Sequence, residues 1–186
     1  IWPQLNCDIY ATPFTSILVQ EKFKEKKIDI SNKIKIVKLD SEITLGPFKI
    51  DFITLTHSIL EPNGLSIQTP IGTILHTGDW KIDPNPLIGG NIDKEKLIAI
   101  GQKGVIAMIC DSTNVLNPGR AGSELSVRES LLNIISKQKN RVIISSFASN
   151  VARMETIFYC AKKTGRNICL VGRSMHRIYK AAKQCG

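Results

Sequence analysis

Apolar and polar side chains alternate along residues 48–56, and this two-residue period is typical of a strand with one buried face. Shorter runs rich in β-branched residues predict three further strands, at residues 34–39, 65–69 and 73–77. A Pro-Ile-Gly sequence separates the last two runs and predicts a hairpin turn. Apolar residues recur at helical spacing over residues 13–27, and the lysine-rich end of this segment suits the negative pole of a helix. The first half of the chain is therefore predicted to consist mainly of strands.

The pattern changes after an irregular stretch rich in proline and glycine, residues 81–91, which is typical of a functional or covering loop. A helix is predicted at residues 93–100, and the apolar run at residues 104–110 predicts a fully buried strand. Predicted helices and strands then alternate, in the order helix 126–138, strand 141–146, helix 150–163, strand 167–171 and a helix from residue 174. This alternation favours a parallel sheet with helical crossovers. We expect an α/β chain of the α+β sandwich type, with a boundary near residues 118–125.

Composition narrows the class of protein. A chain of 186 residues with 42% hydrophobic content is long enough to bury a core. The net charge of +9, from 25 basic and 16 acidic residues, favours phosphate-rich partners such as RNA, DNA or an acidic membrane. The alternative is that the lysines only solvate the fold. No apolar stretch approaches the roughly 20 residues that cross a bilayer, so we expect no membrane span.

The cysteines are scattered and contain no Cys-x-x-Cys pair, which argues against both a disulfide framework and a zinc knuckle; they are Cys7, Cys110, Cys160, Cys169 and Cys185. A reducing, cytoplasmic compartment fits this usage best. Cys110 closes an apolar run and is predicted to be a small buried hydrophobe.

Two possible metal ligands stand at the ends of predicted strands. His57 follows the strand at residues 48–56, and Gly78 permits a tight turn that directs Asp79 toward the same edge. A divalent cation needs neutral nitrogen and anionic oxygen ligands before it can acidify bound water, so this pair is part of a hydrolytic metal site. The alternatives are a hydrogen-bonded structural histidine and a turn-forming aspartate. His76 lies two residues after Ile74 in the predicted strand, so its side chain is expected to face inward with that of Ile74. His76 is therefore predicted to be structural.

Three polar clusters follow other predicted strands. Asp111 opens the first, with Ser112 and Thr113 beside it, and its carboxylate either orients a catalytic imidazole or forms an ordinary Asx turn. The second holds Ser149 and Asn150 at a strand-to-helix junction, where backbone amides suit a phosphate group or where these side chains cap the helix. In the third, Arg173 and Ser174 repeat this junction with an added guanidinium that can hold phosphate in a bidentate manner, and helix capping is again the alternative.

The chain resembles the ribonuclease J family of the metallo-β-lactamase superfamily, whose members carry an inserted β-CASP domain. The matching segments occur in the family's order and cover nearly the whole chain: Tyr-Ala-Thr-Pro-Phe-Thr from Tyr10, His-Ser-Ile from His57, Thr-Pro from Thr69, His-Thr-Gly-Asp-Trp-Lys from His76, Asp-Ser-Thr-Asn from Asp111, Pro-Gly from Pro118, Ser-Glu from Ser123, Phe-Ala-Ser-Asn from Phe147 and Gly-Arg-Ser-Met from Gly172. The pairing of Asp-Ser-Thr-Asn with Phe-Ala-Ser-Asn distinguishes ribonuclease J from other branches.

The resemblance implies a metal-dependent RNA hydrolase that degrades RNA from a 5′-monophosphate end and also cuts internally. It implies that His57 is the histidine ligand of the third metallo-β-lactamase motif and Asp79 the bridging carboxylate of the fourth. Asp111 matches the acidic residue of β-CASP motif A. Two ions, usually zinc with manganese or magnesium as alternatives, polarise the scissile phosphate and supply hydroxide. The implied partners are RNA and further copies of the chain, as a dimer or tetramer in the cytoplasm, with no membrane.

Two parts of the family pattern have no match in this sequence. The His-x-His-x-Asp-His motif and the later β-CASP histidines are absent, although they supply most of the metal ligands and the general acid. The chain also starts within an apolar segment, residues 1–5, and stops at a glycine of the kind that caps a helix. We therefore expect an internal fragment that is inactive alone. It comprises a partial metallo-β-lactamase αββα domain at residues 1–122 and the start of a parallel-sheet β-CASP domain at residues 123–186.

Two other functions are alternatives to this hydrolase. In the first alternative, the chain is the product of a split gene and acts as an inactive, basic RNA-binding remnant. In the second, it is a DNA nuclease or small-molecule hydrolase on the same scaffold. The Phe-Ala-Ser-Asn segment favours the RNA branch over the DNA branch.

Overall fold

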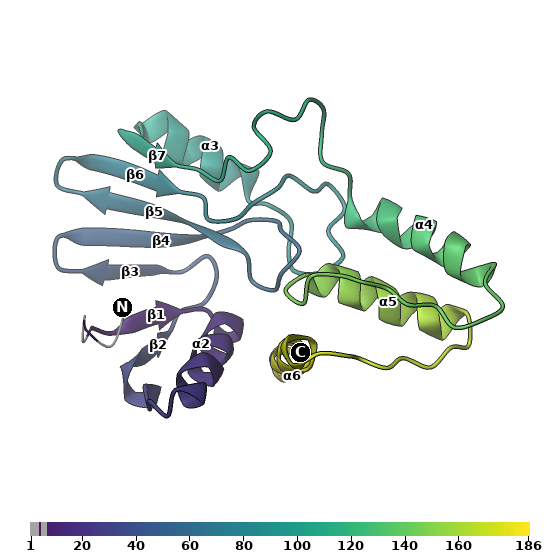
Figure 1. Ribbon diagram of the computed structural model, residues 1–186. Helices are drawn as coiled ribbons and strands as arrows, with labels where there is room; N and C mark the ends of the chain where they lie inside the picture. The colour runs from purple at the N-terminus through teal and green to yellow at the C-terminus, as the bar shows by residue number, and fades with distance from the viewer. Residues whose placement is uncertain (1–3, 5–6) are drawn as a thin grey trace.

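The computed structural model describes residue 4 and residues 7–186, so most of the apolar segment noted at residues 1–5 lies outside the described residues. Within them the chain forms five α-helices and two sheets, which confirms the expected mixed α/β fold (Figure 1). No helix in this part of the chain has the length and apolar character that a bilayer crossing requires.

The larger sheet has five strands in the order β3-β4-β5-β6-β7, with all neighbours antiparallel except the parallel pair β6 and β7. The strands are β3 (Glu42–Leu45), β4 (Phe48–Thr54), β5 (Asn63–Thr69), β6 (Gly72–His76) and β7 (Ala107–Ile109). The expected hairpin between β5 and β6 is confirmed, with Thr69 paired to Gly72. Strand β3 was not expected from the sequence, because its four residues are too short for a clear alternation.

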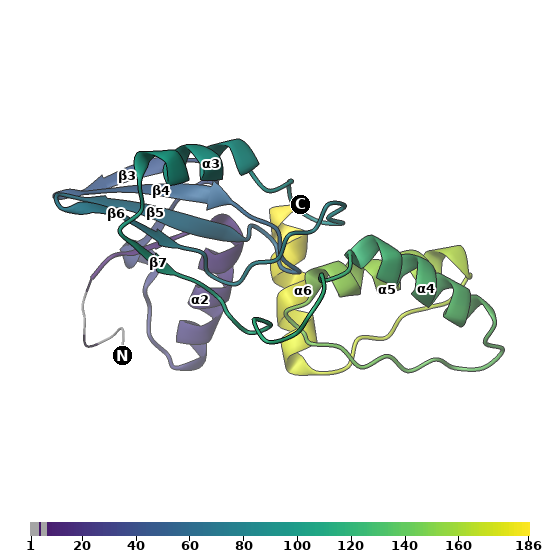
Figure 2. The same cartoon turned by 90° about the horizontal axis from the view of Figure 1, so that it is seen from above.

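Helix α3 (Lys94–Lys103) covers one face of this sheet (Figure 2). Its N-cap is Asp93, whose carboxylate accepts a hydrogen bond from the backbone N–H of Lys96 at 2.9 Å and so satisfies a free helix amide. Ile100 of α3 packs with Ile53 and Leu55 in one apolar cluster. This cluster fixes the helix against the sheet and holds the C-terminal end of β4 in place.

A second, two-stranded parallel sheet pairs β1 (Ile9–Ala11) with β2 (Ile34–Ile36), and the short 3₁₀ helix η1 (Ser31–Lys33) precedes β2. Helix α2 (Pro13–Glu25) follows β1 and matches the helix expected from the sequence. The carboxylate of Glu61 accepts a hydrogen bond from the Phe14 backbone N–H at 2.8 Å. This contact places a negative charge at the positive end of the helix and ties α2 to the loop after β4.

The C-terminal part contains α4 (Glu124–Ser136), α5 (Val151–Lys163) and α6 (Arg173–Cys185), close to the helices expected there. Its core is shared with the first part of the chain, because Phe14 of α2 packs with Val151, Met154, Ile178 and Ala181. An ion pair between Arg177 and Glu25 also joins α6 to α2. The C-terminal helices are thus anchored on α2 rather than on a sheet of their own.

Three expectations about strands are wrong. Residues 141–146 and 167–171 were expected to be strands of a parallel sheet, but neither is a strand among the described residues. The burial of residues 141–150 alternates from one residue to the next, as in a strand, yet these residues have no ladder partner, and a strand needs one. The strand expected to be fully buried at residues 104–110 is the short β7, which is exposed because it is an edge strand that, within the described part of the chain, pairs only with β6. Cys110, expected to be buried, is exposed for the same reason.

Candidate functional site

The end of β4 lies directly beside the loop that follows β6. The backbone N–H of Lys81 donates to the carbonyl oxygen of Thr56 at 2.9 Å, and the Thr56 hydroxyl donates to the carbonyl oxygen of Lys81. The Thr56 hydroxyl oxygen also accepts from the backbone N–H of Asp83 at 3.2 Å. These bonds place His57, one residue after Thr56, next to the segment that contains Asp79.

A second set of bonds brings the end of β7 to the same place. The backbone N–H of Thr77 donates to the carbonyl oxygen of Ile109 at 2.9 Å, and its hydroxyl oxygen accepts from the backbone N–H of Asp111 at 3.1 Å. Thr77 is buried, so this pairing is shielded from water. The three residues that the sequence singled out are His57, Asp79 and Asp111. They follow the C-terminal ends of β4, β6 and β7, which lie together along one edge of the sheet, called the strand-end edge.

Asp111 forms the Asx turn that was one of its two interpretations. Its carboxylate accepts from the backbone N–H of Thr113 at 2.9 Å and from the Thr113 hydroxyl at 2.5 Å. The Thr113 hydroxyl and amide, then the Trp80 amide and the charge of His57, hold the pKa of Asp111 below its ordinary value of 3.8.

His57 carries the most unusual polar atom of this edge. Its Nδ1 is buried and has no hydrogen-bond partner among the described residues. Buried polar atoms are normally paired, and an imidazole nitrogen without a partner keeps a lone pair available for a cation. The side chain as a whole is half-buried, so it remains accessible from the edge.

Asp79 is exposed and follows the turn that the sequence predicted. Gly78 has a φ of 59°, in the left-handed region that glycine adopts without strain. A Cβ atom at this position would lie 3.2 Å from the carbonyl oxygen of Asn63, so the turn also needs the space. The backbone N–H of Gly78 donates to Nδ1 of His76 at 3.0 Å, which agrees with a structural role for His76.

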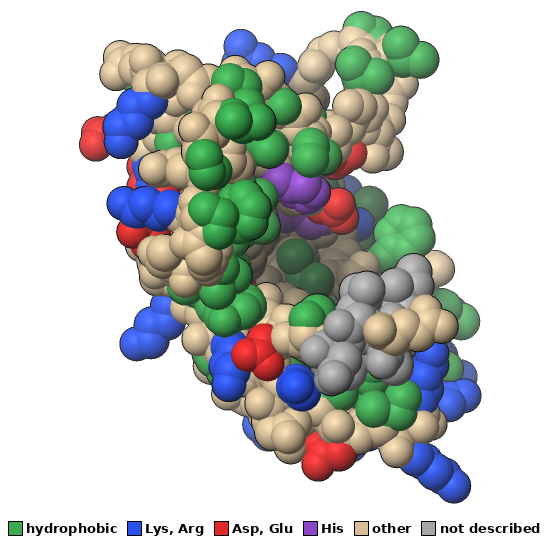
Figure 3. Space-filling view, turned by 90° about the vertical axis from the view of Figure 1, so that its left-hand side faces the viewer, with side chains coloured by type: hydrophobic (Ala, Val, Ile, Leu, Met, Phe, Trp, Pro, Cys, Tyr) green, Lys and Arg blue, Asp and Glu red, His purple; other side chains and the backbone are tan. Residues whose placement is uncertain are grey.

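The described residues hold only part of a metal site. They contain no group of three or more His, Cys, Asp and Glu side chains placed to bind one ion. On the face shown in Figure 3, histidine side chains lie beside a carboxylate at the rim of a hollow. The donor types at this edge, one imidazole and two carboxylates, fit a divalent cation such as zinc, manganese or magnesium.

The residues expected to bind phosphate do not form one cluster. The Ser112 hydroxyl donates to the carbonyl oxygen of Cys110 at 3.2 Å, and Thr113 is used by Asp111. Asn150 caps α5, because its side-chain oxygen accepts from the backbone N–H of Arg153 at 2.8 Å, while Ser149 is exposed. The junction of Ser149 and Asn150 does lie beside the edge, since the Ala152 backbone N–H donates to the carbonyl oxygen of Ser58 at 3.1 Å.

Arg173 and Ser174 are exposed at the start of α6. Arg173 lines a cleft between α2 and α6 together with His176, Arg177 and Lys180. The sequence therefore identified a basic segment, but the structure places it on the side of α6 that faces α2. The phosphate-binding roles of the six residues stay predictions.

The sequence did not identify a buried ionic network that joins the two parts of the chain. Lys81 Nζ lies 3.4 Å from Asp83 Oδ2 and 3.9 Å from Glu124 Oε1, and Arg153 contacts both oxygens of Glu124 at 3.3 and 3.4 Å. Burial raises the pKa of Asp83. The opposing effects of the Ser123 hydroxyl, the backbone N–H groups of residues 85 and 124 and the charge of Lys81 are together larger, so the pKa lies below 3.8. The only available signal was the Ser-Glu pair at residues 123–124, a helix-cap pattern.

Comparison with known proteins supports the resemblance drawn from the motifs. A family model described as Ribonuclease J, beta-CASP domain, matches residues 139–186. Ribonuclease J of Sinorhizobium meliloti is 41% identical over 186 residues, which is 100% of this chain and 33% of that protein. Ribonuclease J of Thermus thermophilus is 35% identical and Ribonuclease J2 of Bacillus subtilis is 32% identical, over 96% and 98% of this chain and 31% and 33% of those proteins. The chain spans about one third of the length of these relatives.

A solved structure supports the fold alone. The crystal structure of a protein of unknown function from Enterococcus faecalis V583 matches with a TM-score of 0.63 at 16% sequence identity. The match covers 93% of this chain and 43% of that one. It shows that the matched part of this chain shares its fold with part of that longer chain.

Proposed function

We propose that this segment, similar throughout to ribonuclease J, belongs to a metal-dependent hydrolase that processes and degrades RNA. The observation that carries the proposal is the convergence of His57, Asp79 and Asp111 at one sheet edge, where His57 keeps a buried Nδ1 without a partner. We further propose that the metallo-β-lactamase part covers residues 1–122 and the β-CASP part residues 123–186. The complete protein would act on RNA in the cytoplasm as a dimer or tetramer.

In this proposal, His57 and Asp79 hold a divalent cation through a nitrogen and a carboxylate oxygen. When bound, such an ion lowers the pKa of a water molecule and neutralises charge on the scissile phosphate. The described residues supply too few ligands for a closed shell. The matched relatives are about three times as long as this chain. We propose that regions outside the matched part supply the remaining metal ligands.

Asp111 would act on His57 rather than on the substrate. The Thr113 hydroxyl and amide stabilise its ionised form, and this fixed negative charge near the imidazole would favour a cation bound at this edge. The Thr113 hydroxyl and amide hold the carboxylate in place. The Asx turn would therefore hold the Asp111 carboxylate in place near His57, the proposed metal ligand.

RNA and DNA cleavage by the full-length protein tests the proposal. We expect cleavage of a 5′-monophosphorylated RNA that chelation abolishes and that zinc or manganese restores, with far slower cleavage of a DNA strand of matched sequence. His57→Ala and Asp79→Asn should each remove most of this activity. Glu129→Gln, which changes an exposed carboxylate on α4, is the matched control and should retain it. Full activity in both His57→Ala and Asp79→Asn would contradict the proposed roles.

A second function is favoured by a different observation. Arg173, Arg177 and Lys180 share the side of α6 that lines its cleft with α2, where they outnumber Glu21 and Glu25 and where Arg177 pairs with Glu25, and the chain carries a net charge of +9. This arrangement fits a segment that binds the RNA backbone without cleaving it. Such binding would weaken steeply with salt and would survive His57→Ala, which separates it from hydrolysis.

A further inference from the structure

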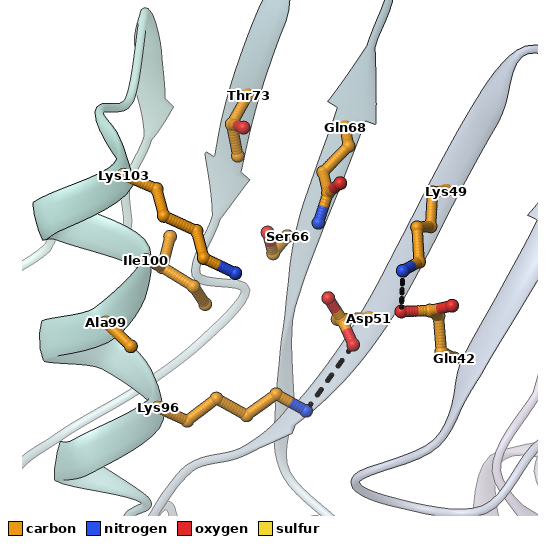
Figure 4. Close-up of a pocket in the computed structure, with 10 residues that line it drawn as sticks. All are labelled: Glu42, Lys49, Asp51, Ser66, Gln68, Thr73, Lys96, Ala99, Ile100 and Lys103. Carbon is orange, nitrogen blue, oxygen red and sulfur yellow. Dashed lines mark ion pairs between the residues drawn. The ribbon is translucent and has the colours of Figure 1, made fainter.

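A cleft of about 250 Å³ lies between α3 and the sheet face that this helix covers, apart from the strand-end edge described above. Figure 4 shows that its lining comes from two sides, with lysines of α3 facing polar side chains of the strands. Three lysines and two carboxylates line it, together with Ser66, Gln68 and Thr73. A cleft with this many polar groups under a helix is not explained by apolar packing.

Ser66 is the residue that points to a ligand. It is only 1% exposed, and its hydroxyl oxygen has no hydrogen-bond partner among the described residues. In the register of the sheet it pairs with Asp51 on one side and Leu75 on the other, and its hydroxyl points toward α3 (Figure 4). A buried hydroxyl without a partner is unfavourable, so a polar group within the cleft would satisfy it.

The charges of the cleft do not cancel. Lys49 Nζ lies 2.8 Å from Glu42 Oε2, and Lys96 Nζ lies 3.6 Å from Asp51 Oδ1, so both carboxylates already have a cation. Lys103 has no ion-pair partner within the described part of the chain, and its ammonium points from α3 toward Ser66 (Figure 4). One positive charge is therefore left over beside the unpaired hydroxyl.

We propose that this cleft binds a phosphate group, either free phosphate or the terminal phosphate of a nucleotide. The Lys103 ammonium, the Ser66 hydroxyl and the Gln68 side-chain amide are three donors that face one space, and a tetrahedral oxyanion offers acceptors to all three. Lys103 is exposed overall, and a neutral ligand would gain nothing from its charge. A cation is excluded by the surplus of positive charge. The site is independent of the metal ligands proposed above.

Calorimetric titration of the purified full-length protein with sodium phosphate, at constant ionic strength and pH 7, tests the inference. We expect saturable binding that Lys103→Gln weakens by about tenfold or more, because a charge-assisted hydrogen bond is lost. Lys94→Gln is the matched control, since Lys94 is an exposed lysine of α3 outside the lining. It should change the affinity by less than about twofold.

Ser66→Ala separates ligand binding from a structural role. We expect weaker phosphate binding together with a higher melting temperature in phosphate-free buffer, because the substitution removes a buried hydroxyl that lacks a protein partner. Adenosine 5′-monophosphate serves as a second probe: tighter binding than free phosphate, with the same dependence on Lys103, identifies a nucleotide ligand, and weaker binding identifies free phosphate. The inference is overturned by phosphate that does not bind saturably, by equal losses in Lys103→Gln and Lys94→Gln, or by unchanged affinity in Ser66→Ala.

Discussion

Thr56 and Lys81 are joined twice, once by the Lys81 backbone N–H on the Thr56 carbonyl oxygen at 2.9 Å and once by the Thr56 hydroxyl on the Lys81 carbonyl oxygen. Thr56 is 2% exposed, so water does not compete for these bonds. The pair connects the end of β4 to the loop after β6. It is therefore the contact that brings His57 and Asp79 to the same edge.

Replacing Thr56 with valine tests this connection. The shape is kept, but the Lys81 carbonyl oxygen loses its donor and the Asp83 backbone N–H loses its acceptor. Leaving such buried groups unpaired costs about 1–3 kcal/mol of unfolding free energy. Urea unfolding should show a lower midpoint with an unchanged slope. Thr44→Val, at an exposed position of β3, is the control, and equal midpoints for the two variants would contradict the expectation.

Thr113→Val should raise the pKa of Asp111. The Thr113 hydroxyl is the largest of the effects that hold this pKa below 3.8, and valine cannot donate a hydrogen bond. Carboxyl carbon chemical shifts, followed by NMR as a function of pH, measure the value directly. In wild type the transition should fall below 3.8, and in the variant it should move upward. A transition at the same pH in both proteins would show that the hydroxyl does not stabilise the ionised form.

Asp83→Asn should destabilise the protein in a pH-dependent manner. The folded-state pKa of Asp83 is lowered, so its ionised form contributes stability above its unfolded pKa near 3.8, and this contribution is lost as the pH falls through the folded value. At pH 7 we expect a loss of about 1–3 kcal/mol, because buried backbone donors lose a charged acceptor. Thermal unfolding at pH 7, 5 and 3 should show the difference from wild type shrink below pH 4. A constant difference would exclude this linkage.

Phe14→Ala should separate the C-terminal helices from α2. Phe14 is fully buried and packs with Val151 and Ile178, so its removal leaves a cavity at the contact of three helices. Substitutions of this type cost about 3–5 kcal/mol. Relative to wild type, hydrogen exchange should accelerate more in α6 than in β4 and β5, because these strands pack in a different apolar cluster. Uniform acceleration along the chain would instead indicate a single cooperative unit.

The sequence predicted those elements whose pattern reflects local burial. The alternating sequence at residues 48–56 correctly predicted β4, although burial rises along this strand rather than alternating, and α2 and α5 were placed within a few residues. The segments at residues 141–146 and 167–171 were expected to be strands from their apolar runs, and burial does alternate along residues 141–146, but neither segment forms a strand among the described residues. Alternation reports which side of a segment faces apolar atoms, and it does not reveal whether a second strand is present to accept its hydrogen bonds.

The candidate site was partly predictable for the same reason. Placing His57 and Asp79 after apolar strands needed only the rule that functional side chains gather at strand ends, and Gly78 supplied the turn. The network of Lys81, Asp83 and Glu124 was not predictable, because Asp83 and Glu124 lie 41 positions apart along the chain and become neighbours only when α4 meets the loop. Long-range contacts of this kind leave no local pattern in a sequence.

The affinity of the full-length protein for zinc tests the central claim, that His57 and Asp79 bind one ion together. Competition with a chromophoric chelator gives this affinity for wild type, His57→Ala, Asp79→Asn and the control His176→Ala, which changes an exposed histidine of α6. We predict that His57→Ala and Asp79→Asn each weaken binding by about 100-fold or more, since even outer-shell changes cost 10–100-fold, while His176→Ala matches wild type. Wild-type zinc affinity in His57→Ala and Asp79→Asn would contradict the claim.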